Sequence, residues 1–81
     1  MKAGFYKDNR GVSVFDTFLF HKQIQDGLIK VSDTKHKNIA QVIDIDQSIW
    51  YVFWDEVGLA APGGDTFEKA EQALAAYCEQ L

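Results

Sequence analysis

The residues that could take part in chemistry are few and dispersed along the chain. Asp44 and Asp46 are two positions apart in an alternating segment, so both carboxylates project from the same face of a strand. Such a pair could bind a divalent cation or divide the roles of acid and base. The alternation with isoleucine also fits the polar side of a strand end, and no third ligand lies nearby in the sequence. We therefore predict neither a metal ion nor a cofactor here.

His21, His36 and Cys78 are the remaining metal-binding or nucleophilic candidates. No two of them have a recognised ligand spacing, and a single cysteine excludes an internal disulfide. A Cys–His nucleophilic pair would depend on a tertiary contact that the sequence does not indicate. An enzyme that uses Asp44, Asp46 or His21 is the weakest hypothesis, and the prediction is that the protein is not an enzyme.

One segment partly matches a phosphate-binding loop. Gly58 and Gly63 have the required gap of four residues, between a predicted strand and a predicted helix. However, Gly64 stands at the lysine position and Asp65 at the hydroxyl position, and an acid at the start of a helix repels phosphate. The segment is instead predicted to be a mobile connection.

Length and composition exclude several classes of protein. The chain has 81 residues, of which 47% are hydrophobic and 25% charged, with a net charge of −4. These values fit one small globular domain, and no apolar run reaches the roughly 20 residues of a membrane helix. The first residues lack the apolar region of a secretion signal, which favours the cytoplasm. Size and acidity fit a small accessory protein of bacterial or phage type, and the acidity argues against binding to nucleic acid.

The pattern of residues predicts an α+β fold, in which an antiparallel meander of four to five strands carries one C-terminal helix on one face. Turn signals such as Asp8 to Gly11 and Asp26-Gly27 separate segments rich in aromatic and β-branched residues. The predicted elements are strands at about 3–7, 12–21, 28–32, 39–46 and 49–54, a loop at 56–65 and a helix at about 66–80.

The C-terminal helix is the clearest of these elements. Asp65 or Thr66 is its predicted N-cap, and an Asp65 cap would place Glu68 at the third helical position of a capping box. Phe67, Leu74 and Tyr77 lie on one face at helical spacing, so they are predicted to pack on the sheet.

The strand at 49–54 is apolar on both faces. Trp50 and Trp54 point to one side, and Tyr51 and Phe53 point to the other. Because one helix covers one face, the other face is predicted to contact a second copy of the chain or another protein, either through Trp50 and Trp54 or through Tyr51 and Phe53. A strongly twisted sheet with half-exposed aromatic residues is the alternative that needs no partner.

Charge is also unevenly distributed. Residues 1–40 carry a net charge of +3 and residues 41–81 a net charge of −7. The resulting prediction is a non-catalytic interaction protein, either a homodimer or a binder of another protein. Two alternatives stay open: a small-ligand-binding module with an aromatic-lined pocket under the segment from Gly58 to Gly64, and an acidic inhibitor that mimics nucleic acid.

Overall fold

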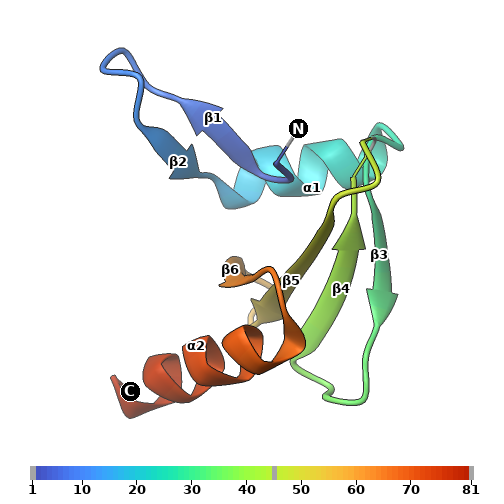
Figure 1. Cartoon of the computed structure of the whole chain (residues 1–81), viewed down its shortest axis with the longest axis vertical. Helices are drawn as coiled ribbons and strands as arrows, with labels where there is room; N and C mark the ends of the chain where they lie inside the picture. Colours follow the sequence, from blue (N-terminus) through green and yellow to red (C-terminus); the bar gives the residue numbers. More distant parts are fainter. Residues whose placement is uncertain (1, 45, 81) are drawn as a thin grey trace.

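The core of the structure is a four-stranded antiparallel sheet whose strands follow one another in chain order (Figure 1). The computed structural model describes residues 2–44 and 46–80. The strands of the sheet are β3 (Lys30–Asp33), β4 (Ile39–Ile43), β5 (Ile49–Trp54) and β6 (Ala60–Gly64). The predicted antiparallel α+β fold is confirmed, and β5 has its predicted bounds. Residue 45, in the predicted strand 39–46, lies outside the described residues.

The predicted strands 3–7 and 12–21 do not join this sheet. They contribute β1 (Phe5–Lys7) and β2 (Ser13–Phe15), which pair only with each other as a hairpin. Figure 1 shows this hairpin at the opposite end of the molecule from the C-terminal helix. The meander therefore has four strands, and its first strand starts only after Gly27.

The prediction of a strand through residues 16–21 is wrong, because α1 (Thr17–Gln25) occupies this region. The side chain of Asp16 caps the helix by accepting the backbone N–H groups of Phe18 and Leu19. At the other end Gly27, with φ of +75°, adopts the left-handed conformation that terminates a helix. The aromatic residues of this segment favour a strand, but the segment forms a helix because Asp16 caps its start and Gly27 terminates it.

The prediction of a loop at 56–65 is wrong for its second half, since β6 pairs there with β5. The small residues of β6 allow an unusually close approach of the helix above it. A Cβ atom added to Gly63 would lie only 2.7 Å from the Cβ of Ala70. Pro62 is compatible with this position because β6 is an edge strand.

The C-terminal helix, α2 (Phe67–Glu79), covers the sheet as predicted. Thr66, not Asp65, is the N-cap, and its hydroxyl accepts the N–H of Lys69 at 3.2 Å. Asp65 instead forms an ion pair with Lys69 at 2.8 Å. The helix packs through the predicted apolar stripe, because Phe67, Leu74 and Tyr77 all contact the cluster formed by Ile39, Phe53 and Ala70.

Both faces of the sheet are covered, so the premise of an unpartnered face is wrong. We call the side under α1 and the β1–β2 hairpin the first face; its buried core includes Phe20 of α1 together with sheet residues Ala40, Val42 and Val52. The second face lies under α2. The sequence pattern failed here because α1, the element that covers the first face, was interpreted as a strand. Within residues 2–44 and 46–80, no helix is long and apolar enough to cross a membrane.

Candidate functional site

The four predicted contact residues pack against their own chain. On the first face, the Trp50 ring lies 5.7 Å from Phe5 and the Trp54 ring lies 5.6 Å from Phe20. On the second face, Tyr51 contacts Phe67 and Phe53 contacts Tyr77. Phe53 is buried, and the other three side chains are half-buried. Contact with another chain through these residues stays a prediction.

Asp44 and Asp46 belong to the turn between β4 and β5. Asp44 is buried, and its Oδ1 accepts the backbone N–H groups of Asp46 and Ser48, each at 3.0 Å. Asp46 is exposed. The described residues contain no group of three or more His, Cys, Asp or Glu side chains that could hold a metal ion. The geometry of Asp44 is that of a residue that stabilises a turn.

The structure does not bring the histidines and the cysteine together. His21 lies on α1 with its ring 5.6 Å from that of Trp54, over the first face. His36 lies in the β3–β4 loop, where its Nδ1 accepts the N–H of Asn38. Cys78 is exposed on α2, the helix that covers the second face. His21 and Cys78 therefore lie on opposite sides of the sheet.

The β5–β6 turn has a well-defined geometry that the sequence analysis missed. Asp55 Oδ1 accepts the N–H groups of Val57 at 3.1 Å and Leu59 at 2.9 Å. The left-handed Gly58, with φ of +87°, completes a three-residue hairpin loop. This network holds the apolar side chains of Val57 and Leu59 on a stable turn.

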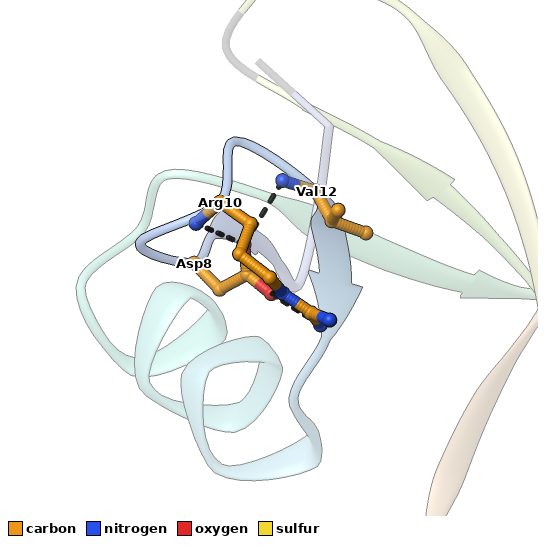
Figure 2. A network of polar contacts seen from close by, with 3 residues as sticks. All are labelled: Asp8, Arg10 and Val12. Atoms are coloured by element: carbon orange, nitrogen blue, oxygen red, sulfur yellow. Dashed lines mark hydrogen bonds and ion pairs between the residues drawn. The ribbon is translucent and has the colours of Figure 1, made fainter.

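The β1–β2 turn is built in the same way. Asp8 Oδ1 accepts the N–H groups of Arg10 and Val12, as Figure 2 shows. Both turns follow the pattern Asp-x-x-Gly-x, with an apolar residue in the last position. The spacing of Asp and Gly could have identified the second turn, since the first was predicted from the same residue types.

The three most exposed large apolar side chains of the described residues lie on α1 and on the β5–β6 turn. Phe18 is 87% exposed, Val57 81% and Leu59 54%. The Thr17 hydroxyl donates a hydrogen bond to the Ala60 carbonyl at 3.0 Å, which joins the start of α1 to the start of β6. Phe18 follows Thr17 and Leu59 precedes Ala60, so this bond brings the backbones of these two residues near each other. We call Phe18, Val57 and Leu59 the apolar patch.

A groove lies between the β5–β6 turn and the C-terminal half of α2, and it shares Val57 with the apolar patch. Its volume is about 420 Å³, and its lining consists of Asn38, Trp54, Asp55, Glu56, Val57, Leu74, Tyr77 and Cys78. The Tyr77 hydroxyl donates to Asp55 Oδ2 at 3.3 Å, which ties α2 to the turn. Burial, and then the negative charge of Asp55, raise the pKa of Tyr77 above its ordinary value of 10.0.

Comparison with known proteins gives no relative from which a function could be transferred. No family model matches the chain, and neither a curated protein nor a solved structure shows significant similarity to it. Functional inference therefore rests on the apolar patch, the groove and the charges around them.

Proposed function

We propose that the protein is a non-catalytic interaction protein that forms a homodimer through the apolar patch. The observation that supports this proposal is the strong exposure of Phe18, Val57 and Leu59, which lie on two segments that the Thr17–Ala60 hydrogen bond joins. The proposal moves the contact surface away from the four predicted aromatic residues, whose rings already have partners within the chain.

Charges around the patch favour a second copy as the partner. Lys22 is exposed on α1 one helical turn after Phe18, and Glu56 is exposed directly before Val57. In a two-fold dimer each contact between the copies occurs twice: when one residue of the first copy contacts another residue of the second, the same pair also meets with the copies exchanged. If α1 of one copy lies against the β5–β6 turn of the other, Lys22 and Glu56 face each other at both ends of the interface. The positive N-terminal half and the negative C-terminal half of the chain favour the same orientation.

Molar mass in solution tests the proposal. The wild-type protein should have the mass of a dimer in light scattering at high concentration, and Phe18→Ser combined with Leu59→Ser should weaken association about tenfold or more, because the contact area of two large apolar side chains is lost. Val12→Ser is the matched control, since Val12 is 49% exposed and lies in the β1–β2 turn. A wild-type monomer at every concentration, or an equal effect of the control, would refute the proposal.

A charge exchange tests the orientation. Lys22→Glu should weaken the dimer by placing two like charges together, and adding Glu56→Lys should restore it. Failure of the second substitution to restore association would exclude this orientation of the two copies.

A further inference from the structure

The groove combines apolar walls with negative charge, and it includes Trp54, one of the four aromatic residues predicted from the sequence to contact another chain. Trp54, Val57 and Leu74 supply apolar surface, and the Tyr77 ring adds a second aromatic group. Asp55 and Glu56 supply carboxylates on the side of the β5–β6 turn. Among the eight described residues that line the groove, none is Lys, Arg or His. Its charge is therefore complementary to a cation.

The acidic side of the groove is held in place. Asp55 is fixed through both of its oxygens, because Oδ1 accepts two backbone N–H groups and Oδ2 accepts the Tyr77 hydroxyl. The pKa of the Tyr77 hydroxyl lies above 10.0, so the group is protonated and donates this hydrogen bond at neutral pH. Glu56, next in the chain, is exposed in the single chain. A ligand thus meets one hydrogen-bonded carboxylate and one exposed carboxylate beside two aromatic rings.

We propose that the groove binds a small organic ammonium compound. The apolar body of the ligand lies against Trp54, Val57 and Leu74, and its charged nitrogen lies beside Glu56 and Asp55. A volume of about 420 Å³ falls within the range of roughly 300–1,000 Å³ that is typical of small-molecule sites. Aromatic rings near the nitrogen add cation–π attraction, which an anion or a neutral analogue does not gain. The groove shares Glu56 and Val57 with the proposed dimer contact, so the two proposals are tested separately below.

The single cysteine provides a direct probe of the groove. Cys78 is exposed and lines it, so a bound ligand should slow the alkylation of its thiol by iodoacetamide. The probe ligand is 2-phenylethylammonium, and its neutral and anionic counterparts are 2-phenylethanol and 3-phenylpropanoate. We expect the ammonium compound to protect Cys78 at a concentration several-fold lower than the alcohol does, and the anion to give the least protection.

Substitutions then test the role of charge. Glu56→Gln should weaken protection by the ammonium compound by up to about fivefold, the range of a single exposed ion pair. Glu71→Gln removes the same charge from an exposed position that does not line the groove, so it should leave protection unchanged. Added salt should weaken the binding of the wild-type protein for the same reason.

The experiment separates this inference from the proposed dimer when it is repeated on the Phe18→Ser, Leu59→Ser double variant, since neither residue lines the groove. If the ammonium compound still protects Cys78 in this variant, the result supports binding in the groove, whether the variant is a monomer or a dimer. Equal protection by the alcohol and the ammonium compound, or no protection together with unchanged NMR amide shifts of Val57 and Cys78, would overturn the inference.

Discussion

The two faces of the sheet are covered in different ways. On the first face, α1 and the β1–β2 hairpin fill space with large rings, and Phe20 is completely buried among Ala40, Val42 and Val52. On the second face, α2 approaches the sheet so closely that Gly63 lies against Ala70.

This difference shows that one sheet can use two kinds of packing. The first face depends on the volume of its side chains, because a lost ring leaves a cavity. The second face depends on the absence of side-chain atoms at Gly63, because added atoms force the helix away. Each helix also has a side-chain hydrogen bond to a neighbouring segment: Tyr77 of α2 donates to Asp55, and Thr17 of α1 donates to the Ala60 carbonyl.

The largest expected effect comes from removing the central ring of the first face. Phe20→Ala should lower the free energy of unfolding by about 3–5 kcal/mol, since Phe20 is fully buried. Leu74→Ala on the second face should cost less, about 2 kcal/mol, because Leu74 is only half-buried. Chemical denaturation measures both. A larger loss for Leu74→Ala would contradict the comparison, because it would mean that the second face also depends mainly on side-chain volume.

The next largest expected effect comes from adding a methyl group at Gly63, where α2 lies very close to the sheet. Gly63→Ala should cost about 1–3 kcal/mol, because the new methyl group would lie 2.7 Å from the Ala70 Cβ. Adding Ala70→Gly should offset part of this loss, although glycine within a helix itself costs about 1 kcal/mol. Strict additivity of the two substitutions in a double-mutant cycle would show that these atoms do not compete for space.

The smallest expected effect is a pH dependence specific to the second face. A pKa that is raised in the folded protein stabilises the fold at pH values below the unfolded value, here near 10.0, and this stabilisation is lost as the pH rises through the folded value. The docking of α2 should therefore weaken in this alkaline range. The NMR chemical shifts of Phe67 and Ala73, followed as the pH is raised, measure this weakening. In Tyr77→Phe this part of the pH dependence should be absent, and its persistence would assign the effect to another group.

Much of the fold was predictable because it depends on local sequence signals. The alternating strands, the turn at Asp8 to Gly11 and the apolar stripe of α2 each follow from residue types at fixed spacing. The region from Asp16 to Gly27 was misinterpreted because aromatic residues favour strands, although Asp16 and Gly27 are a helix cap and a helix stop. That single error produced the prediction of an uncovered face.

The candidate sites were harder to predict because they combine distant parts of the chain. The groove joins Asn38, the β5–β6 turn and α2, and the apolar patch depends on a hydrogen bond between residues 43 positions apart. No spacing in the sequence encodes these contacts.

The sequence by itself determined the local conformations: where helices and turns begin and end, which strand residues are apolar, and that the two halves of the chain carry opposite net charges. These properties depend on backbone preferences and hydrogen bonds within a few residues. Only the tertiary structure decided which apolar residues are buried, because burial depends on which element covers which face. Phe18 and Phe20 are two positions apart, yet one is 87% exposed and the other is completely buried, since α1 turns only one side toward the sheet.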